Sequence, residues 1–101
     1  MKPNKTQNKP DMIVKADGTL IQTSPANGKD YALKEMQDIV NGYIEIIYSP
    51  DGNEIMVLNE EGLLIDGMEK NEVATAKAWT WGYVGNTIMG DVLICNSKHV
   101  K

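Results

Sequence analysis

The sequence predicts one small α+β domain, in which about five short strands form a mixed or antiparallel sheet packed with two helices. Three observations predict this fold. The chain of 101 residues has room for a single domain. Short β-prone runs end at turns rich in Gly, Asp and Asn, and only two segments have a helical pattern. The runs follow the order strand, strand, helix, strand, strand, helix, strand, with residues 63–65 as a candidate extra strand.

The chain is expected to open with a tail and a hairpin. Residues 1–10 are polar, hold three lysines and lack periodicity, which favours a flexible tail before a domain over residues 11–96. Residues 12–15 and 20–23 are short strand-like runs. Asp17-Gly18 lies between them and supplies the positive φ that a tight turn needs. Residues 97–101 are expected to form a polar C-terminal tail.

A helix is expected after this hairpin. Asp30 is the candidate N-cap, with the helix opening at Tyr31. Its buried face is predicted from apolar residues at helical spacing: Leu33, Met36 and Val40. Asn41 and Gly42 tolerate the left-handed conformation, so the helix should end there.

Residues 43–48 are expected to be the central strand. They are β-branched and aromatic apart from one charge, Glu45. Ile44 and Ile46 share a face that the first helix would cover. The turn at residues 50–53 predicts an antiparallel hairpin with a strand over residues 54–59, and a polar turn follows at residues 59–62.

The remainder is expected to add a helix and a closing strand. Residues 68–78 are rich in alanine and begin with acidic residues, which predicts a helix. Residues 79–87 alternate aromatic with small or polar side chains, as an extended segment would. Residues 88–95 are an apolar run that predicts the last strand.

The charge distribution excludes some partners. The net charge is −4, and beyond residue 10 seven lysines face fourteen acidic residues. The chain has no arginine, so an acidic body of this kind is a poor binder of duplex nucleic acid. No apolar run approaches the roughly 20 residues that cross a bilayer, and no secretory signal is visible. We therefore expect a protein of the cytoplasm.

No catalytic or metal-binding pattern is present. Cys95 lies in an apolar run and is expected to be a buried free thiol; the alternative, a nucleophile paired with His99, lacks a catalytic context. One His and one Cys provide no metal-ligand spacing. The acid pairs, at residues 60–61 and at 69 and 72, fit solvated turns and helix starts better than acid–base chemistry. We expect no enzyme and no cofactor.

The aromatic segment is the strongest candidate for recognition. Trp79, Trp81 and Tyr83 would share one side of an extended segment, on which a purine could stack at roughly 1–3 kcal/mol per base. The alternative is that these rings belong to the core or to a dimer interface. Further candidate ligand-binding residues are hydrogen-bonding or cationic: Asn71, Thr75, Asn86, Thr87, and Lys70 or Lys77.

Four short motifs carry a family resemblance: Gly42-Tyr43-Ile44-Glu45, Asn59-Glu60-Glu61-Gly62, Asn71 with Ala74-Thr75, and Met89-Gly90-Asp91-Val92. Their order and spacing resemble the DUF3846 family over residues 11–96. The chain departs from the family at residues 69–72, where a Pro-Asn-Arg-like segment is common, and in its aromatic segment. The resemblance implies an origin in phages or mobile elements, where small non-enzymatic proteins frequently counter host defences.

Two functions from different classes follow. In the first, the protein sequesters a nucleotide-derived immune signal in the host cytoplasm, as a homo-oligomer with sites between protomers. In the second, its acidic body occupies a basic surface of a host defence enzyme such as a nuclease, in the manner of a DNA mimic. A structural or regulatory phage component is the third alternative.

Overall fold

The computed structural model describes residues 9–100, so most of the expected N-terminal tail lies outside the described residues. The fold is the α+β domain that the sequence predicts. The strands and helices are β1 (Asp11–Val14), β2 (Leu20–Thr23), α1 (Leu33–Val40), β3 (Ile44–Tyr48), β4 (Glu54–Asn59), α2 (Glu72–Thr80) and β5 (Val92–Asn96). Two 3-10 turns, η2 (Gly62–Leu64) and η3 (Ser97–His99), complete the described chain.

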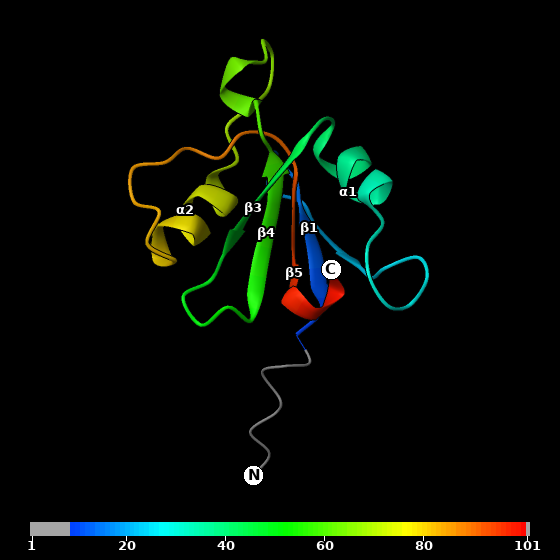
Figure 1. Ribbon diagram of the computed structural model, residues 1–101. Coiled ribbons are helices and arrows are strands. Elements are labelled where there is room, and N and C mark those ends of the chain that lie inside the picture. Colours follow the sequence, from blue (N-terminus) through cyan, green and yellow to red (C-terminus); the bar gives the residue numbers. More distant parts are fainter. Residues whose placement is uncertain (1–8, 101) are drawn as a thin grey trace.

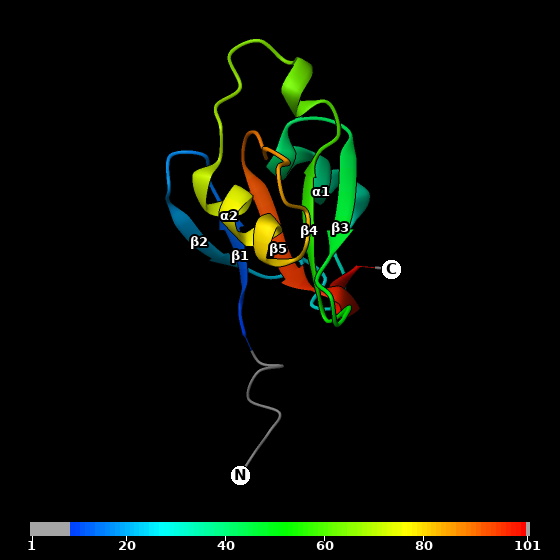
Figure 2. The ribbon, with the colours of Figure 1, turned by 90° about the vertical axis from the view of Figure 1, so that its left-hand side faces the viewer.

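The five strands form one sheet in the order β2-β1-β5-β4-β3, with every neighbouring pair antiparallel. The expectation that residues 43–48 form the central strand is wrong, because β3 pairs with β4 alone and lies at the edge (Figure 2). The central strand is β5. Its run Val92–Cys95 is buried on both faces, which is the pattern of an interior strand.

The two helices cover opposite faces of the sheet (Figure 1). The core on the α1 face consists of Tyr31, Met36, Val40, Ile55, Val57, Leu93 and Cys95. The core on the α2 face consists of Val14, Ile47, Met56, Leu58, Ala74, Ala78, Ile88, Val92 and Ile94. Successive residues of a strand point to opposite faces, so β4 contributes to both cores. Ile44 and Ile46 pack on the α1 side, as predicted.

Helix α1 begins later than the sequence suggests. The N-cap is Ala32 rather than Asp30, and its N–H donates to the Glu35 carboxylate at 2.7 Å. Tyr31 lies before the N-cap, and its hydroxyl donates a hydrogen bond to the buried Asp11 carboxylate. Met36 and Val40 are buried as predicted, but Leu33 in the first turn is 56% exposed. The end agrees with prediction, since Asn41 has a φ of 64°.

Three further boundaries differ from expectation. Residues 63–65 form no strand; Gly62–Leu64 is a 3-10 turn that projects at the top of Figure 1. Helix α2 starts at Glu72 rather than residue 68, since Asn71 caps it, and it continues to Thr80. Strand β5 starts at Val92 rather than residue 88, because the left-handed Gly90 (φ 80°) breaks the run before it.

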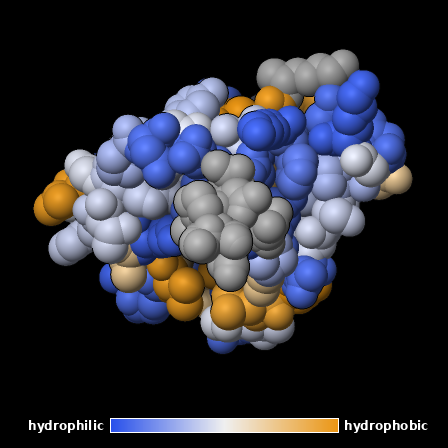
Figure 3. Space-filling view, turned by 90° about the horizontal axis from the view of Figure 1, so that it is seen from below, coloured by the Kyte–Doolittle hydropathy of each residue, from blue (hydrophilic) through white to orange (hydrophobic). Residues whose placement is uncertain are grey.

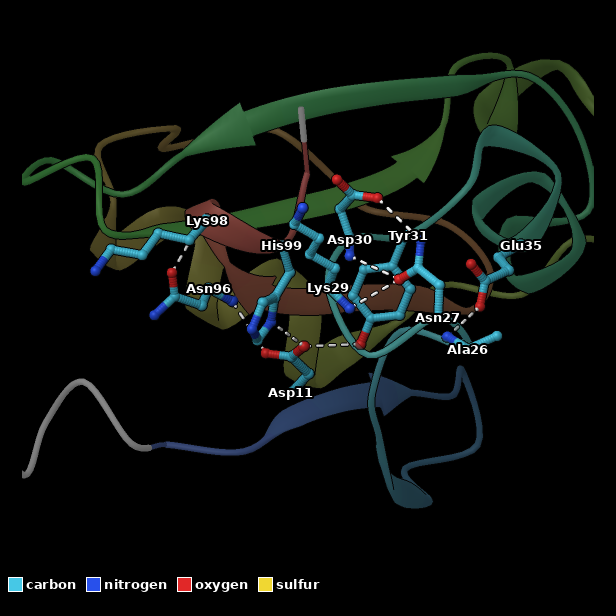
Figure 4. A network of polar contacts seen from close by, with 10 residues as sticks. All are labelled: Asp11, Ala26, Asn27, Lys29, Asp30, Tyr31, Glu35, Asn96, Lys98 and His99. Carbon is cyan, nitrogen blue, oxygen red and sulfur yellow. Dashed lines mark hydrogen bonds and ion pairs between the residues drawn. The ribbon is translucent and has the colours of Figure 1, made fainter.

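Residues 97–100 pack on the domain, although residues 97–101 were expected to form a tail; residue 101 lies outside the described residues. Turn η3 lies beside the segment that precedes α1, because the Tyr31 N–H donates to the His99 carbonyl at 2.8 Å. His99 also contacts Asp11 at the start of β1 (Figure 4). Among residues 9–100, neither helix has the length and apolar character of a membrane span.

Candidate functional site

The aromatic segment does not form the extended platform that the sequence suggested. Trp79 lies in the last turn of α2 and Trp81 is its C-cap. The Gly82 N–H donates to the Trp79 carbonyl and the Tyr83 N–H donates to the Ala78 carbonyl, both at 3.0 Å. These two bonds, with Gly82 at a φ of 101°, form a Schellman motif that ends the helix. The alternation of aromatic residues is therefore a helix terminus.

The three rings consequently lie in different surroundings. Trp81 and Tyr83 are partly buried and pack against the α2-face core, which supports the alternative of a core role. Trp79 is 46% exposed. Its Nε1 donates to the Asn86 carbonyl at 2.8 Å, which holds the ring against the loop over residues 82–87.

Asn71 and Thr75 are buried and form hydrogen bonds inside the protein. Asn71 is 0% exposed; its Oδ1 accepts from the Ala74 N–H at 2.9 Å. Its Nδ2 donates to the carbonyls of Val14 and Gly90. The Thr75 hydroxyl accepts from the Ile88 N–H at 2.9 Å. Asn71 therefore links the start of α2 to β1 and to the segment before β5, and Thr75 links α2 to that same segment.

The two candidate lysines contact acidic neighbours. Lys77 Nζ lies 3.7 Å from the Glu54 carboxylate and 5.9 Å from the centre of the Trp81 ring. Lys70 Nζ lies 3.6 Å from the Glu72 carboxylate. Neither is among the residues that line the groove described next.

A groove of about 500 Å³ on the α2 side of the sheet is the better candidate site. We call it the acidic groove. Its lining residues come from β3, from the end of β4 with the turn that follows, and from the segment before β5: Glu45, Ile47, Leu58, Asn59, Glu60, Glu61, Gly62, Leu63, Leu64, Gly85, Asn86, Thr87, Ile88 and Met89. Asn86 and Thr87 are the predicted site residues that the structure places here.

The acidic groove combines an apolar floor with a negatively charged rim. Ile47, Leu58 and Ile88 are buried members of the α2-face core and form the floor. Glu45, Glu60 and Glu61 are exposed, and no lysine occurs among the described residues that line the groove. Coulomb attraction therefore favours a cationic occupant and disfavours a phosphate.

Two leucines extend this surface. Leu63 and Leu64 in η2 are 72% and 82% exposed, although the preceding Gly62 is buried. An added Cβ on Gly62 would lie 3.0 Å from the Met89 side chain, so glycine permits the close approach of the turn to residue 89. The turn therefore packs against Met89 through Gly62, and its two leucine side chains are exposed.

Asn59 fixes the position of the acidic turn. It is 5% exposed, and its Nδ2 donates to the carbonyls of Val40 and Asn41 at the end of α1. Its Oδ1 accepts from the Glu61 N–H at 2.8 Å. The turn that carries Glu60 and Glu61 is therefore linked to the end of α1 as well as to β4.

The sequence identified Glu45, Glu60 and Glu61 only as solvated carboxylates and missed their convergence with the two leucines. The acidic pair at residues 60–61, separated by one glycine from an apolar run at residues 63–65, was the available signal, because exposed apolar residues beside charges are typical of binding surfaces. Their approach to Glu45 on another strand depends on the strand order.

A second cluster of polar contacts links the start of β1 to Tyr31 and to the residues at the end of β5 and in η3. Asp11 is 3% exposed and accepts hydrogen bonds from the Tyr31 hydroxyl at 2.7 Å and the Asn96 N–H at 3.0 Å (Figure 4). His99 Nδ1 lies 2.7 Å from the same carboxylate. Burial, followed by the hydrogen bond to Asp11, raises the pKa of Tyr31. A polar cavity of about 240 Å³ adjoins Asp11, at the largely hydrophilic end of the molecule seen in Figure 3.

No reactive constellation was found in the described part of the chain. Cys95 is a buried thiol, as predicted, and burial raises its pKa to about 12. It is therefore a poor nucleophile at neutral pH. The residues described contain no cluster of three His, Cys, Asp or Glu side chains that could hold a metal ion.

The comparisons with known proteins identify a family. The model of the family described as "Domain of unknown function (DUF3846)" matches residues 9–100. No curated protein and no solved structure matches the chain.

Proposed function

The chain belongs to the DUF3846 family, and we propose that it is a non-enzymatic binding protein whose acidic groove occupies a basic surface of a partner protein. The observation that carries the proposal is the convergence of three exposed carboxylates and two exposed leucines around one apolar-floored groove. Carboxylates attract and orient a basic partner, and the leucines supply apolar area to bury.

The motifs that resemble the family support this location. Residues of three of the four motifs line the acidic groove: Glu45, Asn59–Gly62 and Met89. The fourth motif, with Asn71 and Thr75, supports the fold from within. The groove is thus built from the segments on which the likeness rests.

The proposed partner is a defence protein in the cytoplasm of a bacterial host, because the resemblance implies a phage or mobile-element origin. Nucleases and other enzymes that bind nucleic acids expose basic surfaces, which the three carboxylates would match. Binding would block such a surface without chemical change in either protein.

Capture from host lysate with the tagged chain tests the proposal. Three baits are compared: the unaltered chain, Glu60→Gln with Glu61→Gln, and the control Glu69→Gln with Glu72→Gln, which changes the net charge equally outside the groove. We expect one partner to be retained by the first and third baits and lost from the second. High salt should also release it, since the Debye length falls from about 10 Å at 0.1 M to 3 Å at 1 M. A partner that binds all three baits equally would contradict the proposal.

Sequestration of a nucleotide-derived immune signal by a homo-oligomer is a second proposal. The observation that favours it is Trp79, whose half-exposed ring is held by the Nε1 bond to Asn86 and offers a stacking surface. Thermal-shift titration with cyclic dinucleotides, cyclic oligonucleotides and ADP-ribose derivatives tests it, with Trp79→Leu as the variant expected to lose the shift. Native mass spectrometry of the purified chain would report the oligomer and any retained ligand. A monomer that none of these compounds stabilises would exclude this mode.

A further inference from the structure

The outer edge of β3 carries unpaired backbone groups beside the acidic groove. The Glu60 N–H donates to the Tyr43 carbonyl and the Ser49 N–H donates to the Glu54 carbonyl, both at 2.9 Å. Bonded residues alternate along an antiparallel pair, so the residues of β3 that bond to β4 have odd numbers. The N–H and C=O groups of Ile44, Ile46 and Tyr48 therefore point away from the sheet.

This edge has little of the usual protection against strand pairing. Edge strands are commonly short or carry lysine, proline or a bulge. Over its five residues, β3 has no lysine or proline, and its register with β4 is continuous. Tyr48 is 54% exposed, and Glu45 is the single charge.

The two faces of the edge differ in chemistry. Ile47 packs in the α2-face core, so Glu45, two residues before it, lies on the same face and lines the acidic groove. Ile44 and Ile46 pack on the α1 side, and Tyr48 follows them in the alternation. A strand added here would meet carboxylates on one face and apolar side chains on the other.

We propose that β3 accepts an extended segment of the partner protein as a sixth strand, and that this segment alternates lysine or arginine with apolar residues. The inference deepens the proposed function and rests on it. The cationic side chains enter the acidic groove beside Glu45, and the apolar ones lie against Ile44, Ile46 and Tyr48. Backbone hydrogen bonds supply affinity, and the alternating side chains supply selectivity.

Charge complementarity favours a partner protein over a second copy of this chain. Neither of the two edge strands contains a lysine: β3 reads Ile-Glu-Ile-Ile-Tyr and β2 reads Leu-Ile-Gln-Thr. Pairing of either strand with β3 would therefore leave the carboxylates of the groove without a cation from that strand.

A labelled peptide of alternating lysine and valine provides the test, read by fluorescence anisotropy with the full chain. A control peptide has the same sequence but carries N-methyl groups on the amides that would donate to β3. The two peptides therefore have equal charge, and the control lacks those hydrogen-bond donors. We expect the control peptide to bind at least about tenfold more weakly. A peptide of alternating glutamate and valine should not bind.

Two variants of the protein test the same edge. Tyr48→Pro removes an outward N–H without removing a ladder bond to β4, and Tyr48→Thr is its matched control. Both variants lose the tyrosine ring, so the outward N–H is the difference that matters between them, and we expect the proline variant to bind about tenfold more weakly than the threonine variant. The methylated control peptide requires no altered protein, so the test holds even if the proline variant does not fold.

The outcomes separate strand addition from the proposed function. Equal binding of the two lysine peptides, or no binding of either, would overturn strand addition while lysate capture still tests the acidic groove. The two lysine peptides could instead bind equally well to the unaltered chain and lose that binding in the variant Glu60→Gln with Glu61→Gln. This result would place a basic partner in the groove without an added strand. A homodimer that Tyr48→Pro dissociates would assign the edge to a second copy and overturn the proposal.

Discussion

Asn71 shows at the scale of the residue that a polar side chain with ligand-binding chemistry can be fully engaged in the fold. It caps α2 and satisfies the carbonyls of Val14 and Gly90. Thr75 has the same kind of role towards Ile88. Residue type alone could not distinguish these side chains from exposed Asn86, because the distinction depends on burial.

Replacement of Asn71 by alanine should destabilise the protein strongly. The change removes an N-cap and the amide that donates to the buried carbonyls of Val14 and Gly90, which costs about 2–4 kcal/mol in unfolding free energy. Urea denaturation measures this. The control Asn86→Ala, at an exposed position, should change stability by less than about 0.5 kcal/mol. Similar values for the two variants would contradict the role assigned to Asn71.

Cys95 should make the protein less stable in alkali. Its pKa is raised to about 12 in the fold, whereas an unfolded thiol titrates near about 8.5. The folded state therefore binds the thiol proton more tightly than the unfolded state does. The resulting contribution to the free energy of unfolding is complete below about pH 8.5 and declines as pH rises towards 12. Between pH 7.5 and 10 the unaltered chain should lose about 2 kcal/mol more than Cys95→Ala. Denaturation curves at the two pH values measure the difference, and equal losses would contradict a buried thiol.

At the scale of the element, both hairpins, both helices and the end of α1 were predicted from local sequence. Turn residues and helical periodicity act over a few positions, so they can be recognised without the fold. The start of α2 was predicted too early because Asn71 is selected as the cap by long-range bonds to Val14 and Gly90. The end of α2 was predicted too early because Trp81-Gly82-Tyr83 was interpreted as extended and is a helix terminus.

Gly82 should be required for that terminus. It has a φ of 101°, and an added Cβ would meet no heavy atom within 4 Å, so a substitution tests backbone strain alone. Gly82→Ala should cost about 1 kcal/mol in unfolding free energy. Gly82→Asn should cost less, because asparagine tolerates left-handed conformations better. Thermal or urea denaturation of both variants checks this order, and a stabilising alanine would argue against the Schellman motif.

At the scale of the whole molecule, the sequence predicted the fold class but neither the strand order nor the functional surface. The order β2-β1-β5-β4-β3 places the last strand at the centre and the most β-prone run at the edge. Propensity reports how well a residue suits a strand, not which strands will be its neighbours. The acidic groove depends on this order, because Glu45, the turn at residues 60–64 and residues 85–89 are far apart in the chain.

The strongest expectation at this scale concerns where a basic ligand binds. Three carboxylates line one groove, next to an open strand edge, whereas the ring of Trp79 lies at the end of α2 and meets the lining of the groove at Asn86. A cationic extended ligand should therefore affect β3 and the groove together and leave α2 unchanged. A nucleotide that stacks on Trp79 would instead affect the end of α2 and the loop at Asn86, and leave β3 unchanged.

Amide chemical-shift mapping with the alternating lysine–valine peptide measures this most directly. The account predicts shifts confined to residues 43–48, 59–64 and 85–89, which diminish as salt is raised. Shifts centred on Trp79 and the end of α2, or no shifts at any residue, would contradict binding at the acidic groove.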